Sequence, residues 1–179
     1  MKASGPMSRL PIDHFGLVTH ALNELMGFFL NTTPYTRQGE IIYDVFHDAR
    51  ITFLGLPIDG VPRLELIEPQ SPTSRVFNAA RHGGGLHHIC FQVASLVAFS
   101  SWCRAVRVTL ILAPTEAPAF GSGRRIAFVS IPGLGLVEFV ETCEAPSLMD
   151  VDASVFRQMK KSFVTLLQCH TGSGSSACS

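Results

Sequence analysis

The sequence IDHFGLV at Ile12–Val18 decides the fold, because a related stretch, HHICFQV, recurs at His87–Val93. Both stretches are short, largely apolar and contain β-branched or aromatic residues, a composition that is typical of strands. Each includes a histidine at a matching place, since His88 stands 74 positions after His14. The match predicts that a similar unit begins twice along the chain.

A second pair of landmarks closes the two units. The sequence LELIE at Leu64–Glu68 corresponds to VEFVE at Val137–Glu141, and Glu138 follows Glu65 by 73 positions. The two offsets differ by one residue although they come from separate landmarks. We therefore interpret the chain as an internal duplication that places a His on the first strand and a Glu on the last strand of each unit.

Between these landmarks, hydrophobic periodicity and turn residues predict the order strand, helix, strand, strand, strand in each unit. The fold class is therefore α+β, with two tandem βαβββ modules at about 10–69 and 84–142 inside one domain at 10–142. In the first module we expect strands and one helix at Ile12–Val18, Ala21–Leu30 (helix), Ile41–Phe46, Ile51–Leu56 and Arg63–Glu68. A short helix at Ser74–Arg81 precedes the second module, with elements at His87–Val93, Ser95–Val106 (helix), Val108–Leu112, Arg125–Ile131 and Gly135–Glu141.

The composition of the chain limits the classes of partner that it can bind. It has 179 residues, and its 14 Lys and Arg balance 14 Asp and Glu, so no basic surface favours nucleic acid. No stretch reaches the about 20 apolar residues that span a bilayer, and the N-terminus lacks an apolar signal-peptide core, so we expect a cytoplasmic protein with no membrane partner. Charged residues make up only 16%, against about 25% in an average domain, which favours burial in a homodimer interface.

The composition changes after Cys143. An amphipathic pattern predicts an appended helix at about 150–168, and the sequence TGSGSSACS at 171–179 predicts a disordered tail. We expect the helix to matter for assembly and not for the chemistry of the chain.

His14, Glu65, His88 and Glu138 occupy equivalent places in the two units, so modules packed about a pseudo-two-fold axis would bring them to one point. Two imidazole nitrogens and two carboxylate oxygens suit a divalent ion such as Co, Ni, Zn, Mn or Fe. Four protein ligands leave octahedral positions for water or a substrate oxygen, which indicates a catalytic site. We therefore predict one divalent metal ion per chain.

Strand parity supports this interpretation. In LELIE, Glu65 faces away from the two leucines, and in VEFVE Glu138 faces away from Val137 and Phe139. Each carboxylate thus lies on the opposite face of its strand from the apolar core, as expected for the lining of a cavity.

The remaining histidines receive no catalytic role. His87 precedes His88, so the alternation of a strand places it on the other face, as a structural or supporting residue. His20, His47 and His82 fall in loops or at strand ends, where a histidine most often has no special function.

At these residues the chain resembles the vicinal oxygen chelate superfamily, the glyoxalase/bleomycin-resistance/dioxygenase group, over about Leu10 to Thr142. The subgroup it most resembles is that of the methylmalonyl-CoA epimerase-like proteins. The motifs that carry the resemblance are IDHFGLV, LELIEP followed by SPTSRVFNAARHGGGLHHICFQV, and GSGRRIAFVSIPGLGLVEFVE. The resemblance implies a cup-shaped mixed sheet around a metal held by residues matching His14, Glu65, His88 and Glu138.

The resemblance also implies a reaction, in which a carboxylate removes the proton next to a metal-chelated carbonyl group. We expect an isomerase or epimerase with Glu138 as the first candidate base and Glu65 as the second, acting on a small carbonyl substrate such as an acyl-CoA. The epimerases use a further carboxylate near their third strand. Here the corresponding sequence, DARITFLGL, offers Arg50 and Thr52, with Asp48 only at its start.

Two alternatives remain open. The first is a lyase or a tailoring isomerase or cyclase of secondary metabolism, which would use the same metal on a larger apolar carbonyl substrate. The second is a metal-free small-molecule binding protein of the resistance type, which predicts an aromatic-lined groove and no bound metal.

Overall fold

The structure is a computed structural model that describes residues 10–121 and 123–142. In order along the chain, the elements are β1 Ile12–Val18, α1 Leu22–Thr32, β2 Thr36–Asp44, β3 Ala49–Gly55, β4 Arg63–Pro69, α2 Phe77–Arg81, β5 Gly85–Val93, α3 Leu96–Val106, β6 Leu110–Glu116, the 3-10 helix η1 Pro118–Phe120, β7 Arg125–Ile131 and β8 Gly135–Glu141. The order strand, helix, strand, strand, strand therefore occurs twice, as the sequence predicts. The appended helix at 150–168 and the tail at 171–179 lie outside the described residues.

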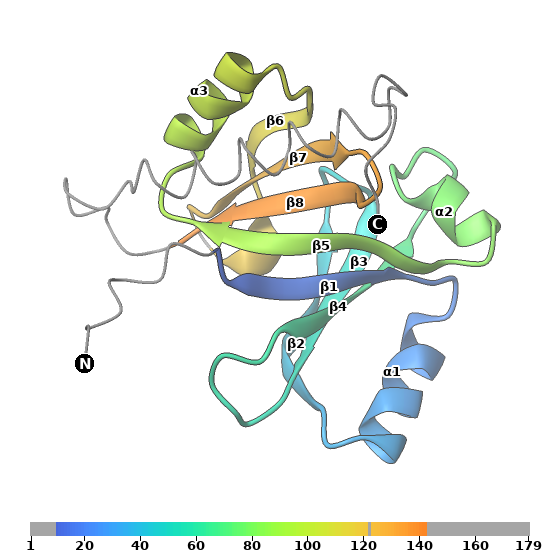
Figure 1. The fold of residues 1–179 in the computed structure, drawn as a ribbon. Helices are drawn as coiled ribbons and strands as arrows, with labels where there is room; N and C mark the ends of the chain where they lie inside the picture. Colours follow the sequence, from blue (N-terminus) through green and yellow to red (C-terminus); the bar gives the residue numbers. More distant parts are fainter. Residues whose placement is uncertain (1–9, 122, 143–179) are drawn as a thin grey trace, which may run out of the picture.

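All eight strands belong to one mixed sheet with the order β2-β3-β4-β1-β5-β8-β7-β6 (Figure 1). The first module contributes one half of the sheet and the second module contributes the other. Within the halves β1 pairs in parallel with β4, and β5 with β8. The two halves join through antiparallel pairing of β1 with β5 at the centre. The first strand of each module thus lies beside its last strand, where the predicted ligands are.

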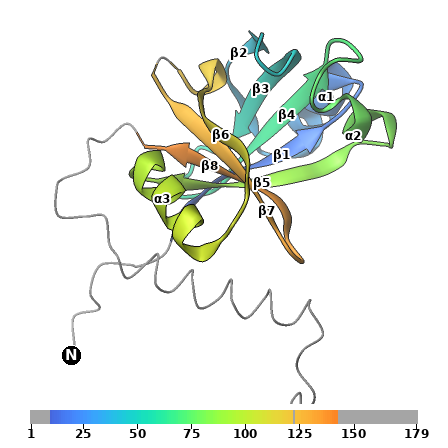
Figure 2. The ribbon, with the colours of Figure 1, turned by 90° about the horizontal axis from the view of Figure 1, so that it is seen from above.

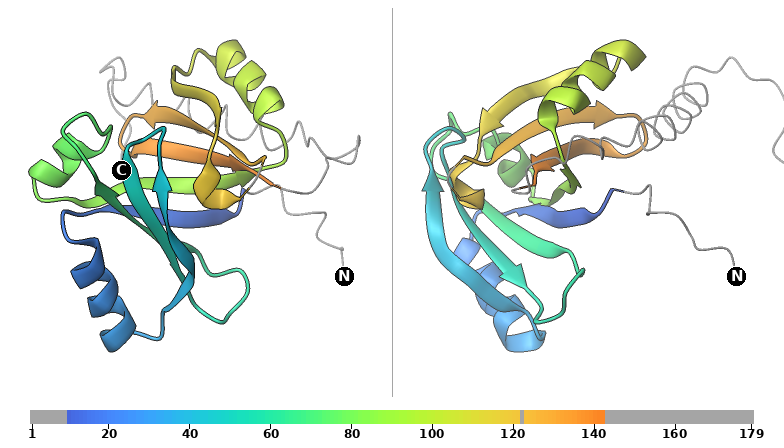
Figure 3. Two further views of the ribbon diagram at one scale, coloured as in Figure 1. Left: turned by 180° about the vertical axis from the view of Figure 1, so that it is seen from behind. Right: turned by 90° about the vertical axis from the view of Figure 1, so that its left-hand side faces the viewer.

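The sheet is strongly curled. Figures 2 and 3 show that its two ends, β2–β3 and β6–β7, bend toward the same side, while α1 and α3 lie outside the curve. The result is the cup-shaped α+β fold that the resemblance implied. Because side chains alternate along a strand, a strand presents one face to the outside of the curve and the other to the inside of the cup.

Helix packing covers the outer face of each half. In the first half, Leu22 of α1 packs with Leu54 and Leu66 of the sheet, and all three are fully buried. In the second half, Phe99 of α3 contacts Phe139 of β8 with ring centroids 4.0 Å apart. These apolar clusters fix the convex side of the sheet and leave the concave side for other contacts.

A glutamate at the end of the last strand fixes the start of each helix. The Leu22 N–H of α1 donates to Glu68 Oε1 at 3.2 Å, and the Leu96 N–H of α3 donates to Glu141 Oε1 at 3.0 Å. A carboxylate at a helix N-terminus satisfies a free backbone N–H and interacts favourably with the helix dipole. The duplication therefore extends to the contact that attaches each helix to its sheet.

In the part of the chain that the structure describes, every helix is too short or too polar to span a membrane.

Candidate metal centre and cavity

The four predicted ligands converge at the bottom of the cup. His14 lies on β1, Glu65 on β4, His88 on β5 and Glu138 on β8, the four central strands of the sheet. All four side chains are buried, and their ligand atoms lie within 4.8 Å of one another. The register explains the convergence, since Gly16 pairs with both Glu65 and His88 across the two sides of β1.

The spacing of the donor atoms suits a single ion. His14 Nε2 lies 3.0 Å from Glu138 Oε2 and 3.3 Å from Glu65 Oε2, and 3.1 Å from His88 Nε2. His88 Nε2 lies 3.2 Å from an oxygen of each carboxylate. Ligands at about 2.1 Å from an ion are about 3.0 Å apart when adjacent in an octahedron and about 3.4 Å apart in a tetrahedron. The observed separations fall in this range.

The position of the hydrogen on the His14 ring is also consistent with a bound cation. Its Nδ1 lies 2.9 Å from Asp13 Oδ1, and because a carboxylate only accepts, Nδ1 carries the hydrogen. In a neutral ring Nε2 then presents a lone pair toward the two carboxylates. Among the described residues Glu138 Oε2 finds no hydrogen-bond partner, although two ring nitrogens lie within 3.2 Å of it, because these contacts lack hydrogen-bond alignment. Lone pairs gathered in a buried site fit a bound cation.

The titration behaviour of the group points the same way. Burial opposes the charged form of His88, but the Glu138 carboxylate close to its Nε2 raises the pKa of the imidazole to about 9. Burial likewise opposes ionisation of Glu65, but the positive charge of His14 lowers the pKa of this carboxyl to about 2. The pKa of Glu138 is also lowered, against the effect of burial, by the imidazoles of His14 and His88, which lie within 3.2 Å of its carboxylate. The cluster therefore favours ionised carboxylates with positive charge between them.

Asp13 orients the first histidine from behind. Its carboxylate accepts from the Arg63 guanidinium and from Gln92 Nε2 at 2.8 Å, besides its contact with His14. Burial opposes its ionisation, but the hydrogen bond with His14 and the charge of Arg63 lower the pKa of Asp13 strongly. An ionised carboxylate on the outer nitrogen of a ligating histidine fixes the ring and strengthens it as a donor.

Gly16 makes room for the second histidine. A Cβ atom at this position would lie 2.2 Å from His88 Cε1, closer than any real contact of a Cβ atom. The His88 ring therefore crosses the backbone of β1 at the one residue without a side chain. This glycine is a structural requirement of the site that no motif in the sequence identifies.

The structure corrects the prediction for His87. This residue does not point to the far face, because the pairing of β1 with β5 shifts between Gly16, which pairs with His88, and Leu17, which pairs with Leu86. The irregularity places His87 on the inner side, where its Nδ1 lies 3.0 Å from His88 Nδ1. Burial and the positive charge of His88 lower the pKa of His87, so its neutral ring can accept from His88.

A cavity of about 300 Å³ opens above the four residues. Its polar floor includes Glu65, His88 and Glu138, while His14 is completely buried beneath it. The walls are mostly apolar and come from both halves of the sheet, and they include Phe120 and Phe128. The volume is at the lower end of the range of about 300 to 1,000 Å³ for small-molecule sites.

The cavity also contains polar residues that the sequence analysis did not assign to a site. Asp44, His47 and Arg75 line it. His47 was expected to have no special function, and the structure places it on the wall of this cavity. Its only signal in the sequence is an Asp three residues before it at the end of a strand, a common turn pattern.

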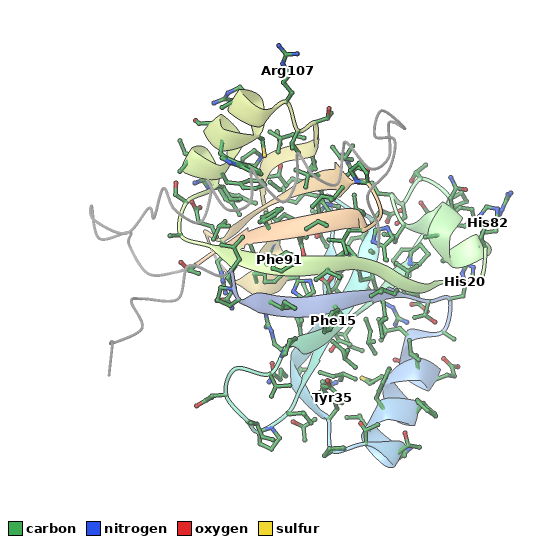
Figure 4. All side chains as sticks on the ribbon, in the orientation of Figure 1. Phe15, His20, Tyr35, His82, Phe91 and Arg107 are labelled. Atoms are coloured by element: carbon green, nitrogen blue, oxygen red, sulfur yellow. The ribbon has the colours of Figure 1, made fainter. Side chains whose placement is uncertain are left out.

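The residues near the third strand that the sequence offered as substitutes do not line the cavity. Arg50 Nε donates to Glu68 Oε2 at 2.8 Å beside helix α1, and Asp48 accepts from the Tyr43 hydroxyl at 2.7 Å. His20 and His82, which were also expected to have no special function, do not line the cavity. Both side chains are exposed, and Figure 4 places them at the edge of the molecule.

Comparison with known proteins agrees with the fold. Residues 13–128 match the family described as the Glyoxalase/Bleomycin resistance protein/Dioxygenase superfamily. No curated protein matches the sequence significantly.

Several solved structures share the fold. A methylmalonyl-CoA epimerase of Streptomyces coelicolor in complex with 2-nitronate-propionyl-CoA is similar with a TM-score of 0.64 at 27% identity, over 75% of this chain and 98% of that one. A methylmalonyl-CoA epimerase in complex with methylmalonyl-CoA and NH4+ gives 0.64 at 26% identity, over 76% and 96% of the two chains. A methylmalonyl-CoA epimerase from Mycobacterium tuberculosis gives 0.65 at 21% identity, over 75% and 89%, and supports the fold alone.

Proposed function

The chain belongs to the glyoxalase/bleomycin resistance protein/dioxygenase superfamily, and we propose that it is a metal-dependent isomerase or epimerase that removes a proton next to a carbonyl group. The observation that carries the proposal is the buried group of two imidazoles and two carboxylates at the bottom of a cavity. A buried carboxylate without a hydrogen-bond partner in such a group is suited both to holding a cation and to accepting a proton.

His14, Glu65, His88 and Glu138 would hold the ion, which is one of Co, Ni, Zn, Mn or Fe. When bound, a divalent cation polarises a carbonyl oxygen and stabilises the negative charge that develops on it. Asp13 and His87 keep the outer nitrogens of the two histidines occupied, so that both Nε2 atoms face the centre.

Glu138 is the first candidate for the base. Its side chain lines the cavity, and Oε2 has no hydrogen-bond partner among the described residues. The lowered pKa keeps the carboxyl group of Glu138 ionised at neutral pH, which is the form that a base requires. Glu65 lines the same floor and is the second candidate.

The cavity suggests the size and charge of the substrate. Its apolar walls and small volume suit a short acyl group, with any larger carrier outside. Arg75 lines the wall and has no ion-pair partner among the described residues, so it can attract an anionic group. The similar epimerases bind methylmalonyl-CoA or 2-nitronate-propionyl-CoA. A small acyl thioester with an acidic α-proton and a negative charge fits these features.

The test is incorporation of solvent deuterium. Purified protein is stripped of metal, reconstituted with each of the five ions, and incubated in D2O with methylmalonyl-CoA, other acyl-CoAs and α-keto acids. We expect mass spectrometry to find deuterium at the α-carbon of one substrate, with loss of exchange after chelation and in Glu138→Gln. Exchange that is equal with and without metal, or absent for every compound and ion, would contradict the proposal.

A lyase or a tailoring isomerase or cyclase is the second candidate. The predominantly apolar wall of the cavity favours it, because an apolar carbonyl compound would fill this space without a charged group. The two candidates differ in their products. In the same assay a lyase or cyclase changes the mass or connectivity of the substrate, whereas an epimerase changes only the configuration and the isotope at one carbon.

Two features of the protein remain predictions from its composition. A homodimer is expected from the low fraction of charged residues, and light scattering of purified protein tests it. A cytoplasmic location also remains a prediction of this kind.

A further inference from the structure

Asp44 and His47 form a pair on the wall of the cavity that the proposed reaction has not yet used. Asp44 ends β2, and His47 lies in the loop that leads to β3. Both line the cavity whose floor includes Glu138. They come from the first half of the sheet, whereas Glu138 comes from the second.

The contacts of Asp44 define the state of the His47 ring. Oδ2 lies 2.7 Å from His47 Nδ1, and Oδ1 accepts from the backbone N–H groups of Phe46 and His47 at 2.9 and 3.2 Å. Burial opposes ionisation of Asp44, but the hydrogen bond and charge of His47 lower its pKa. The carboxylate therefore accepts from Nδ1–H, and Nε2 is left to exchange a proton.

The loop that carries His47 is tied to its surroundings at several points. Ser74 Oγ donates to the His47 carbonyl oxygen at 2.9 Å, and the Gln70 N–H donates to the Asp48 carbonyl oxygen at 2.9 Å. The Tyr43 hydroxyl donates to the Asp48 carboxylate at 2.7 Å. A group fixed in this way meets the requirement that a catalytic acid or base be held in place.

Fixing the loop does not by itself require an imidazole at this position. Asp44 already caps two backbone N–H groups through Oδ1, as the residue at such a turn commonly does. The second oxygen orients a ring that lines a largely apolar wall, and the His47 side chain is only 15% exposed. An acid or base that is oriented by a carboxylate and lines the same cavity as a candidate base is an arrangement suited to proton transfer.

We propose that His47 is a second acid–base group of this site, positioned by Asp44, and that it exchanges a proton with the substrate carbon on the side away from Glu138. The inference rests on the proposed function. Glu138 takes the α-proton, and the electron pair of the broken C–H bond moves toward the carbonyl oxygen. The His47 imidazolium then gives its Nε2 proton to the same carbon, and the returning electron pair forms the new C–H bond. Proton exchange with solvent restores both residues.

The experiment measures two quantities together, the inversion of configuration at the α-carbon and the incorporation of deuterium at the same carbon. Each enantiomer of methylmalonyl-CoA is incubated in D2O with the metal-loaded wild type and with His47→Gln, Asp44→Asn and His82→Gln. For His47→Gln we expect inversion to fall about a hundredfold or more, with deuterium exchange retained for the enantiomer that Glu138 deprotonates. We expect a smaller loss and a displaced pH profile for Asp44→Asn. His82 is exposed and outside the cavity, so its variant is the control and should match the wild type.

A second variant separates chemistry from structure. His47→Ala leaves space on the cavity wall, and added imidazole should restore part of its inversion activity, whereas an equal concentration of a neutral, non-basic heterocycle should not. Metal content should equal that of the wild type in all variants, because neither Asp44 nor His47 belongs to the metal group.

The outcomes distinguish this inference from the proposed function. Absence of exchange in the wild type overturns both. A wild type that exchanges and inverts beside a His47→Gln protein that inverts at the same rate overturns the role of His47 alone. Loss of inversion that imidazole does not restore in His47→Ala assigns His47 a structural role and also overturns the inference.

Discussion

The two halves of the sheet are nearly identical at the metal centre and differ at the ends of their outer hairpins. In the first half Phe53 pairs with Glu65 and its ring contacts His14 at 5.5 Å. In the second half Phe128 pairs with Glu138 and contacts His88 at 5.3 Å. The duplication thus repeats the ligand and also the aromatic ring that packs beside it.

The hairpin connections have diverged in chemistry. Between β2 and β3 the chain presents the polar pair of Asp44 and His47 to the cavity. Between β6 and β7 it presents Phe120, whose ring lies 5.4 Å from that of His14 and 5.2 Å from that of Phe53. The difference teaches that the symmetric part holds the metal ligands, while the asymmetric part adds a polar pair from the first half and an aromatic ring from the second half to the lining of the cavity.

The largest effect is expected from substituting the equivalent carboxylates of the two halves, Glu65 and Glu138. Glu138→Gln keeps an oxygen ligand and removes the base, so α-proton exchange should fall about a hundred- to ten-thousand-fold. Glu65→Gln should lose less activity if Glu138 alone takes the proton. Deuterium exchange rates at saturating metal measure the asymmetry, and equal losses would mean that the two halves share the role of base.

The next test concerns Gly16 of β1, where the His88 ring lies against the backbone. Gly16→Ala places a Cβ atom against His88, so metal affinity should fall by about 10- to 100-fold. Gly27→Ala on α1 is the matched control, because nothing lies within 4 Å of the added atom. Calorimetric metal titrations compare the variants, and equal affinity in Gly16→Ala and wild type would show that the ring does not need this space.

Protons and metal should compete for the histidines. With the pKa of His88 raised to about 9 before metal binds, its imidazole carries a proton at neutral pH that the ion must displace. Metal affinity should therefore rise with pH up to about 9 and fall in acid, with release of at least one proton per ion near pH 7. Titrations in buffers of different ionisation enthalpy measure this release. Affinity that is constant over this range would contradict it.

The smallest effects are expected at the helix contacts that the two halves share. Glu68→Gln and Glu141→Gln weaken the contacts to Leu22 and Leu96, and each should lower the free energy of unfolding by about 1 kcal/mol. Glu40→Gln alters only an exposed ion pair and should change stability by less than about 0.5 kcal/mol. Urea denaturation measures all three. A large inequality between Glu68 and Glu141 would show that the halves are stabilised differently.

The sequence predicts most of the centre because its signals are local. Offsets and strand parity placed Glu65 and Glu138 on the inner face, and the strand at Gly135–Glu141 has the predicted bounds. The strand expected at Ile41–Phe46 exists, but its predicted bounds are wrong. Strand β2 runs over Thr36–Asp44, at the edge of the sheet with mostly exposed residues, so its pattern carries no alternation.

The other misses depend on contacts that no local pattern encodes. Strand β2 ends at Asp44 because the Asp44 carboxylate accepts hydrogen bonds from the backbone N–H groups of Phe46 and His47, which form a turn. The position of His87 depends on an irregular pairing with β1, and the position of His47 depends on how far the hairpin curls over the cup. Each requires the assembled sheet.

Metal stoichiometry tests the central claim most directly. Protein stripped with chelator, reconstituted with each candidate ion and freed of excess is analysed for metal, beside His14→Ala and Glu138→Ala. The arrangement of His14, Glu65, His88 and Glu138 predicts one ion per chain in the wild type and a large loss in both variants. Metal content well below one per chain for every ion, or full occupancy that survives both substitutions, would contradict the account.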